Sequence, residues 1–295
     1  MGVLLLDSIN QPADLKQLNE KQVEQLCEEI RSFLLKNISK TFFPGTVHEK
    51  TALDNLSLTL HEGDFVTVIG GNGAGKSTML NAIAGTFSVD SGSILIDGKD
   101  VTRLPEFKRA ALLGRVFQDP MMGTAPTMQI QENLALAARR GKHRGLKWGI
   151  TPQEEQEYYQ KLKDLDLGLE DRMKAKVGLL SGGQRQALTL LMAALQKPKL
   201  LLLDEHTAAL DPRTAAKVLE LSDKIVEENH LTTMMITHNM KDAIAHGNRL
   251  IMMDAGHVVL DISGEEKKKL TVSDLLTLFS KASGTEANDD KLLLS

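Results

Sequence analysis

Apolar residues follow two different periods along the chain. From about Leu35, the stretches LLKNISKTFF and TALDNLSLTLHEGDFVTVIG alternate as strands do, with Gly63 and Asp64 at a turn inside the second stretch. Further on, KLLLLDE and TTMMITH are short continuous apolar runs, which are typical of strands buried in a parallel sheet. Helical patterns lie between these strands, so the sequence predicts an α/β fold around a mostly parallel sheet.

Other segments fit the same alternation. STMLNAIAG reads as a helix that ends at Gly85, and SGSILIDGKD as a short hairpin with Asp97 and Gly98 at its turn. RLIMMDAGHVVLDI predicts a terminal hairpin, and residues from about 120 to 180 are rich in charge and in helical pattern. We find no internal repeat.

The first 34 residues have a different character. Pro12 suits a helix start, and Asn19 with Gln22 three residues later suits a capping pair. Apolar residues then recur at helical spacing, at Val23, Leu26, Cys27, Ile30 and Leu34. These residues predict an appended amphipathic helix. At the other end, the segment after about Ser280 has the composition of a disordered tail.

Composition narrows the possible partners. The chain has 295 residues, 42% hydrophobic and 25% charged, which is typical of a globular protein. A net charge of -4 argues against nucleic acid or an anionic membrane as the main partner. Cys27 is the one cysteine, so no internal disulfide forms. No apolar run approaches the roughly 18 residues that cross a bilayer, so a membrane role would need another chain.

The segment GGNGAGKST fits the phosphate-binding pattern G-x-x-x-x-G-K-[ST]. Small residues let several backbone N–H groups turn toward phosphate oxygens, and the following helix adds its positive end. Lys76 would reach the β- and γ-phosphates, and the Ser77 hydroxyl would face Mg²⁺. A strand before the loop and a helix after it disfavour a chance glycine-rich turn. The expected nucleotide contacts are Gly70, Gly71, Asn72, Gly73, Ala74, Gly75, Lys76, Ser77 and Thr78.

Two carboxylates close the apolar run LLLLDE. The carboxyl end of a buried parallel strand lies at the ligand-binding edge of the sheet, close to the phosphate-binding loop. We therefore expect Asp204 to hold Mg²⁺ and Glu205 to orient or deprotonate the attacking water. Strands often end in acidic residues, so the interpretation depends on the pairing with GGNGAGKST.

Together with these motifs, LSGGQRQ and the following LLLLDEHTAALD resemble the nucleotide-binding subunits of ATP-binding cassette (ABC) transporters. The resemblance covers about residues 35–265. It implies a P-loop ATPase with ATP and Mg²⁺ as cofactors, a mostly parallel core sheet, an antiparallel β subdomain and a small helical subdomain at about 120–180. Residues 266–295 would add a C-terminal helix and the tail.

In that family, LSGGQ opens a helix that faces the γ-phosphate of ATP bound to the other subunit. The resemblance therefore assigns contacts in trans to Ser181, Gly182, Gly183 and Gln184. Taken alone, a serine followed by two glycines is equally a helix cap. Asp211 resembles the D-loop aspartate at the dimer seam, and it also suits a cap before Pro212.

Four more positions are compared with family positions one at a time. Gln118 in RVFQDP resembles the glutamine that reaches Mg²⁺ or lytic water, and His238 in ITHNM resembles the switch histidine at the γ-phosphate. Phe42 resembles the aromatic residue that stacks on adenine, with Phe43 as its rival because adjacent strand residues face opposite ways. His206 departs from the family, which usually has proline there, and we assign it no catalytic role.

The resemblance also implies partners. It predicts a homodimer or a pseudo-dimer with a second ABC ATPase, a membrane permease, an extracytoplasmic solute-binding protein and a location at the cytoplasmic face of a bacterial membrane. Met121, Met122 and Met128 suit a groove for a permease helix, although core packing explains each equally well. The basic stretch Arg139 to Lys147 suits lipid head groups or a solvated loop.

The motif sequences resemble most those of ATPases from amino-acid-type bacterial importers, including ones for tryptophan or tyrosine. An exporter or lipoprotein-extraction ATPase is the alternative. A non-transport cassette is disfavoured, because Gln118 and Ser181 lie too close together for a long coiled-coil insertion.

Residues 1–35 resemble a second family, the opening segment of 1-deoxy-D-xylulose-5-phosphate synthase. We expect this resemblance to end near Leu35, where cassette sequence begins. Nothing later in the chain resembles the active sites of that synthase. We therefore expect no synthase activity, and we interpret the segment as a passive or docking helix from a fusion.

Overall fold

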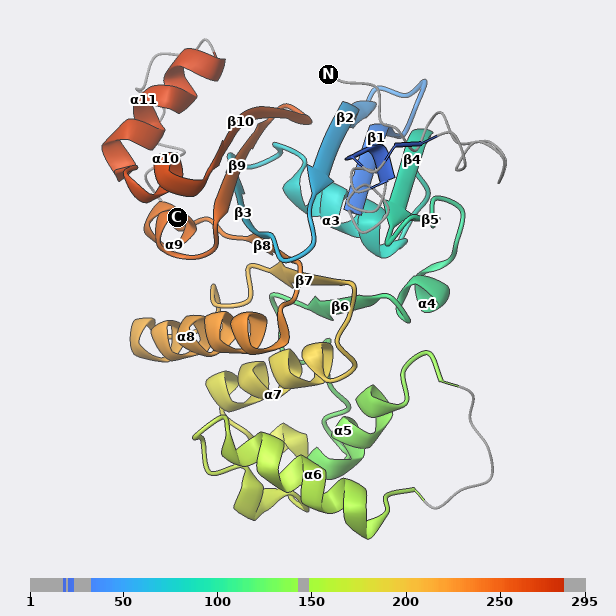
Figure 1. Cartoon of the computed structure of the whole chain (residues 1–295), viewed down its shortest axis with the longest axis vertical. Helices are drawn as coiled ribbons and strands as arrows, with labels where there is room; N and C mark the ends of the chain where they lie inside the picture. The colour runs from blue at the N-terminus through green and yellow to red at the C-terminus, as the bar shows by residue number, and fades with distance from the viewer. Residues whose placement is uncertain (1–17, 20, 24–32, 143–148, 284–295) are drawn as a thin grey trace.

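The computed structural model describes residues 18, 19, 21–23, 33–142 and 149–283. Within these residues the strands form two sheets, one of four strands and one of six. The six-stranded sheet runs across the middle of the molecule in Figure 1, between the antiparallel strands and a lower group of helices. A compact set of elements therefore surrounds one central sheet.

The smaller sheet is antiparallel and has the order β2-β1-β4-β5. Its strands are β1 (Phe33–Phe42), β2 (Lys50–Leu60), β4 (Ser91–Ile96) and β5 (Lys99–Asp100). The predicted turn between β4 and β5 is present, with positive φ at both Asp97 (53°) and Gly98 (70°). β1 pairs from Phe33 onward, opposite Leu60 and Ile96, so the expected boundary after residue 34 lies inside a strand.

The larger sheet has the order β10-β9-β3-β8-β7-β6. Its strands are β3 (Phe65–Gly70), β6 (Leu113–Val116), β7 (Leu200–Asp204), β8 (Thr233–Ile236), β9 (Arg249–Asp254) and β10 (His257–Ser263). All pairs are parallel except the terminal β9–β10 hairpin. The predicted mostly parallel sheet is confirmed. The turn at Gly63 is also present, but β2 and β3 on its two sides belong to different sheets.

Helices pack on this sheet and extend from one end of it. α3 (Lys76–Ala84) and α4 (Glu106–Arg109) follow the strands near the antiparallel sheet, and α8 (Pro212–Asn229) and α9 (Met240–Ala245) follow β7 and β8. α5 (Ile130–Ala138), α6 (Pro152–Lys163) and α7 (Gly182–Ala194) form the lower group in Figure 1. α10 (Gly264–Lys268) and α11 (Val272–Ser283) lie beside β10. None of the helices in the described ranges has the length and apolarity to cross a membrane.

Both faces of the larger sheet are covered by apolar packing. Leu201 and Leu203 of β7 join one buried cluster with α7 and α8, while Leu200 and Leu202 join another with α3 and the antiparallel sheet. All four side chains have no exposed surface. The continuous run LLLL is explained by this two-sided burial, because successive side chains of a strand face opposite ways.

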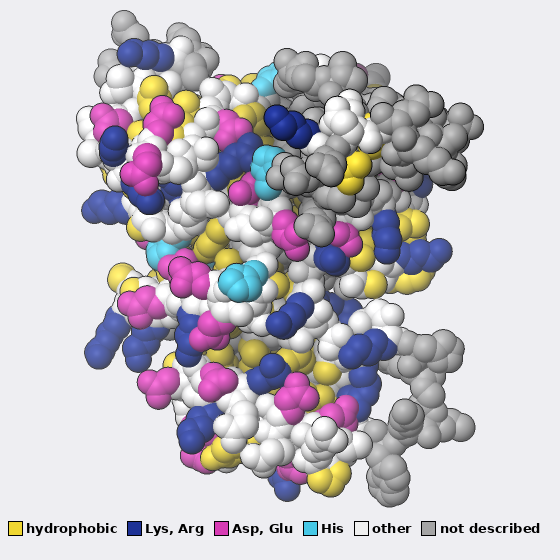
Figure 2. All heavy atoms as spheres, viewed as in Figure 1, with side chains coloured by type: hydrophobic (Ala, Val, Ile, Leu, Met, Phe, Trp, Pro, Cys, Tyr) yellow, Lys and Arg dark blue, Asp and Glu magenta, His cyan; other side chains and the backbone are white. Residues whose placement is uncertain are grey.

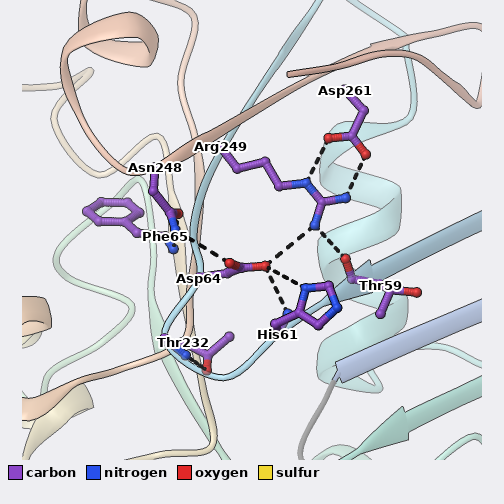
Figure 3. Close-up of polar contacts among 9 residues, drawn as sticks. Thr59, His61, Asp64, Phe65, Thr232, Asn248, Arg249 and Asp261 are labelled. Atoms are coloured by element: carbon purple, nitrogen blue, oxygen red, sulfur yellow. Dashed lines mark hydrogen bonds and ion pairs between the residues drawn. The ribbon is translucent and has the colours of Figure 1, made fainter. Parts of the chain in front are cut away.

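Arg249 connects the two sheets near the turn before β3 (Figure 3). From β9 it makes a paired contact with Asp261 of β10, at 2.7 and 2.6 Å, and donates to the carbonyl oxygen of Thr59 in β2 at 2.7 Å. Asp64 lies 3.5 Å from the same guanidinium. These bonds hold the end of β2 against the larger sheet, which sets where β3 and the loop after it begin.

Parts of the predicted appendages lie outside the described residues. Asn19 and Gln22 form the predicted capping pair, each accepting from the backbone N–H of the other at 3.0 and 2.9 Å. The rest of the expected N-terminal helix, the chain after residue 283 and most of the basic stretch from Arg139 to Lys147 are not described. On the face shown in Figure 2, acidic and basic side chains are interspersed over the lower helices.

Candidate active site

The loop between β3 and α3 has the backbone that the phosphate-binding pattern requires. Gly70, Gly73 and Gly75 have positive φ values of 151°, 84° and 101°. A Cβ on Gly75 would lie 2.5 Å from the carbonyl oxygen of Ala52, so only glycine fits there. α3 has no side-chain cap at its N-terminus. Its first N–H groups therefore remain available for an anion.

Lys76 is folded back over this loop. Its Nζ donates to the carbonyl oxygens of Gly70 and Gly71, at 2.6 and 3.1 Å. Burial lowers the pKa of the amine, while Glu205 and Asp204 raise it by their negative charge. The Lys76 amine thus lies near enough to both carboxylates at the end of β7 to interact with their charge, and the two backbone carbonyl groups stabilise its positive charge.

Glu205 and His238 meet at the ends of neighbouring strands. Glu205 Oε1 contacts His238 Nε2, and the Glu205 side chain is 12% exposed. The Glu205 backbone has a left-handed φ of 45° and donates its N–H to Ile236 of β8 at 3.0 Å. Adjacent parallel strands bring their carboxyl ends to one edge. Register between β7 and β8 therefore places these two residues together.

One pocket of about 310 Å³ collects most of the predicted nucleotide contacts. Phe42 lines it, whereas Phe43 is 66% exposed and is not among its lining residues. The Phe42 ring packs edge-on against Phe87, with ring centroids 5.4 Å apart. The full lining is Phe42, Lys50, Ala52, Asn72, Gly73, Ala74, Gly75, Lys76, Ser77, Thr78, Glu205 and His238.

The LSGGQ segment lies in a different part of the surface. Ser181 caps α7, because its hydroxyl oxygen accepts from the backbone N–H of Gln184 at 3.2 Å. The side-chain oxygen of Gln184 in turn accepts from the backbone N–H of Ser181. Ser181 and Gly182 are exposed, whereas Gly183 is buried against Thr214 of α8. Ser181, Gly183 and Gln184 line a separate pocket of about 410 Å³ that shares no lining residue with the first.

Besides the LSGGQ segment, five predicted residues do not line the nucleotide pocket, namely Gly70, Gly71, Gln118, Asp204 and Asp211. Gln118 is exposed, two residues after the end of β6, and it is not among the lining residues. Asp211 caps α8 ahead of Pro212, accepting from the N–H of Thr214 at 3.1 Å. Hydrogen bonds from Thr214 lower the pKa of the Asp211 carboxyl. The predicted cap is therefore present.

Arg115 on β6 is a site residue that sequence reasoning missed. Its Nη2 donates to Asn81 of α3 at 2.7 Å and lies 3.5 Å from Asp204 Oδ2. Burial raises the pKa of Asp204, and Arg115 opposes this effect. Lys50 was also missed, although it lines the pocket. No local motif marks either residue, because both arrive through strand pairing with distant parts of the chain.

Comparison with known proteins agrees with this arrangement. A family model described as ABC transporter matches residues 53–208. A tyrosine transport ATP-binding protein of Clostridioides difficile is 47% identical over 248 residues, covering 84% of this chain and 98% of that protein. A methionine import ATP-binding protein of Rhizobium johnstonii is 37% identical over 211 residues, which are 70% of this chain and 56% of that protein.

The chain belongs to the ABC transporter family.

Solved cassettes share the fold. A dimeric ATP-binding cassette in a post-hydrolysis state bound to ADP and Pi has a TM-score of 0.67 at 32% identity, covering 78% of this chain and 98% of that one. A nucleotide-free cassette from an ABC transporter also has a TM-score of 0.67, at 27% identity over 84% of this chain and 98% of that one. This ABC protein is therefore an ATP-binding and ATP-hydrolysing subunit, as predicted.

A second family model, for 1-deoxy-D-xylulose-5-phosphate synthase, matches residues 6–62. The predicted resemblance is confirmed, but it extends well beyond Leu35 and overlaps the ABC match at residues 53–62. In the structure, β1 and β2 from this stretch pair with each other, and β1 pairs with β4. Their apolar side chains join the same buried cluster as α3, so residues 33–62 pack as part of the ABC cassette.

Proposed function

We propose that the chain is the motor of a bacterial importer that takes up an amino acid, with tyrosine or a related aromatic amino acid as the solute class. A relative named for methionine import supports this direction of transport, and one named for tyrosine transport supports the solute class. The proposed mechanism depends on one observation, which is that the two segments suited to bind phosphate lie apart on the surface. The phosphate-binding loop and the LSGGQ segment line two different pockets of one chain.

Hydrolysis would take place where Glu205 and His238 meet. Glu205 is placed to accept the proton of the attacking water, and the contact with His238 orients its carboxylate. Lys76 would leave the carbonyl groups of Gly70 and Gly71 for phosphate oxygens, which are stronger acceptors for an ammonium group. Phe42, in the same pocket, would stack on adenine.

The donor set suits Mg²⁺, which prefers hard oxygen ligands. Ser77 lines the pocket and Asp204 ends β7, so the Ser77 hydroxyl and the Asp204 carboxylate would hold the ion. When bound, Mg²⁺ would help to neutralise the negative charge of the phosphates. Gln118 would join them only after a movement of the segment that follows β6, because it is exposed here.

A complete site would need two cassettes arranged head to tail. The Ser181 hydroxyl, the N–H groups of Gly182 and Gly183, and Gln184 would then face the γ-phosphate held by the other copy, with Asp211 at the seam. The exposed N-terminus of α7 supports this arrangement, since helix N-termini favour anions. A solved relative is a dimer with ADP and Pi. The partner would be a second copy or another ABC ATPase.

A permease would dock beside the segment after Gln118. Met121, Met122 and Leu179 are 41%, 69% and 70% exposed, which is unusual for such apolar side chains. Arg185 of α7 links the two segments that carry these side chains. It contacts Met121 Sδ at 2.7 Å and donates to the Gly178 carbonyl oxygen at 3.2 Å. Met128 is only partly exposed and fits the packing interpretation better. We place the complex at the cytoplasmic face of the membrane, with a solute-binding protein outside.

Replacing the proposed base tests this function. Glu205→Gln keeps the shape of the side chain but removes the carboxylate, so we expect ATP turnover to fall at least about 100-fold while ATP binding is retained. ATP should then hold two copies together, which size-exclusion chromatography with light scattering would detect. Glu62→Gln, a carboxylate on the turn before β3, is the control and should turn over normally. A Glu205→Gln protein with normal turnover would contradict the proposal.

A further inference from the structure

His206 follows Glu205 directly, yet its side chain is buried on the other side of the backbone. It is 2% exposed, and its Nε2 lies 2.9 Å from the Ser222 Oγ of α8. Glu205, in contrast, lines the nucleotide pocket. Two consecutive side chains thus attach the end of β7 to two different parts of the molecule.

The direction of the His206–Ser222 bond follows from the next bond in the chain. The Ser222 hydroxyl lies 2.8 Å from the Val218 carbonyl oxygen, which can only accept, so the single hydroxyl proton is committed there. The Ser222 oxygen must then accept from His206, which therefore carries its proton on Nε2. The 2.9 Å contact is therefore a donation from the ring to the hydroxyl oxygen.

The Glu205 backbone needs support of this kind. Its φ of 45° lies in the left-handed region, which costs a residue with a side chain roughly 1 kcal/mol. Such a conformation persists only where the surroundings hold it. The N–H of Glu205 is held by Ile236 of β8, and the His206 side chain holds the following residue against α8.

The same helix also fixes the segment that carries His238. Asp223, next to Ser222, accepts from His246 Nδ1 at 2.7 Å, and His246 directly follows α9. α9 in turn begins two residues after His238. α8 is therefore attached to both of the segments whose side chains meet in the pocket.

We propose that His206 and Ser222 are a positioning pair that holds Glu205 in register with His238. This inference rests on the proposed role of Glu205 in hydrolysis. A pair that only filled the core would contribute to stability and leave the rate of the chemical step unchanged.

The test measures ATP turnover by four variants of the full chain: His206→Phe, which fills the space without a donor; His206→Gln, which keeps an N–H donor; Ser222→Ala; and the His206→Phe/Ser222→Ala pair. We expect kcat to fall about tenfold in His206→Phe and Ser222→Ala, with KM for ATP changed less than about threefold. His206→Gln should recover most of the rate. The double variant should lose no more than the worse single variant, because one link is broken in each.

Two further measurements separate positioning from folding and from the proposed function. Ser280→Ala is the matched control, since Ser280 is a helical serine that also donates four residues back, at 3.0 Å, and its kcat should be unchanged. Melting temperatures follow folding. Normal kcat in His206→Phe and Ser222→Ala with a lowered melting temperature would overturn the inference. Glu205→Gln is measured in parallel, because normal turnover there would instead remove the proposed function.

If His206→Phe does not fold, Ser222→Ala and His206→Gln still decide the matter. A slow Ser222→Ala protein beside a fast His206→Gln protein supports the link. Equal, wild-type rates in both contradict it. As a readout besides rate, the slow variants should also keep the ATP-held dimer longer than the wild type, as Glu205→Gln is expected to do.

Discussion

Individual ionisable residues around α8 are paired rather than left isolated. His246 lies 2.7 Å from Asp223, and this hydrogen bond raises the pKa of the imidazole. Burial lowers that pKa, and of the smaller effects Asp242 raises it and Lys267 lowers it. Lys267 is 2% exposed and donates to the His246 and Gly247 carbonyl oxygens, and burial lowers its pKa to about 8. The surroundings of His246 and Lys267 shift their pKa values, and these shifts set the pH range in which each charged side chain is present.

The His246–Asp223 pair predicts a pH-dependent stability. A histidine whose folded pKa is raised stabilises the protein fully below its unfolded pKa, about 6.5, and loses this contribution as pH rises through the folded pKa. Asp223→Asn should therefore destabilise the protein by roughly 0.5–1 kcal/mol more at pH 6 than at pH 8, as the pair is partly exposed. Urea unfolding of both proteins at the two pH values measures this difference.

An exposed pair provides the control for that experiment. Asp54 and His257 lie 3.5 Å apart, with side chains 59% and 50% exposed. Asp54→Asn should therefore show no pH-dependent difference, since exposed pairs contribute little. An equal loss of stability at both pH values in Asp223→Asn would show that His246 is not charged in the pair. The scan ends at pH 8, where Lys267, with its pKa lowered to about 8, is about half deprotonated.

At the scale of elements, helix N-termini repeat one local design for different purposes. α6 and α7 both begin with a capping box, Thr151 with Glu154 and Ser181 with Gln184. α3 has no side-chain cap and leaves its first N–H groups open beside the pocket. The cap at Ser181 shows that a structural and a functional interpretation of LSGGQ are compatible, because the capping hydroxyl stays exposed.

Matched cap deletions separate the two roles. Ser181→Ala and Thr151→Ala each remove one capping hydroxyl, so each should cost about 1 kcal/mol of stability. Only Ser181→Ala should also lower ATP turnover, because α6 is not proposed to face nucleotide. Ser181→Arg should abolish turnover in the dimer but leave nucleotide binding to the single chain nearly unchanged. Equal turnover in Ser181→Ala and Thr151→Ala would remove Ser181 from the site.

At the scale of the whole molecule, the described part of the cassette begins with β1. Phe33, Leu34 and Leu35 are 3%, 6% and 0% exposed and belong to the strand that pairs with both β2 and β4. The match to the synthase model crosses this point without a break. We therefore propose from the packing of these three side chains that the folded cassette includes residues 33–35.

Two truncations test that boundary. Removing residues 1–32 should leave ATP turnover within about twofold of the full chain, because all described strands are kept. Removing residues 1–35 deletes three buried apolar side chains and should cost several kcal/mol, seen as a large drop in melting temperature. Loss of turnover in the shorter deletion would show that the appended segment contributes to catalysis. An unchanged melting temperature in the longer one would place the boundary elsewhere.

Much of this protein could be predicted because its signals are local. The loop at GGNGAGKST requires small residues at fixed spacing, and the caps at Asn19, Ser181 and Asp211 join groups three residues apart. Strand runs such as LLLLDE show burial directly in their composition. Local contacts of this kind depend on neighbouring residues only, so they can be predicted from the sequence before the fold is known.

The sequence by itself determined the α/β class, the phosphate-binding loop, the order of the motifs, the end of α3 and the starts of α7 and α8. Only the tertiary structure decided that β2 and β3 part into different sheets, that Arg115 reaches Asp204, and that His206 turns inward to Ser222. It also separated the LSGGQ pocket from the nucleotide pocket. These relations join residues far apart in the chain, whose meeting depends on how the sheets and helices pack, and no short stretch of sequence encodes that.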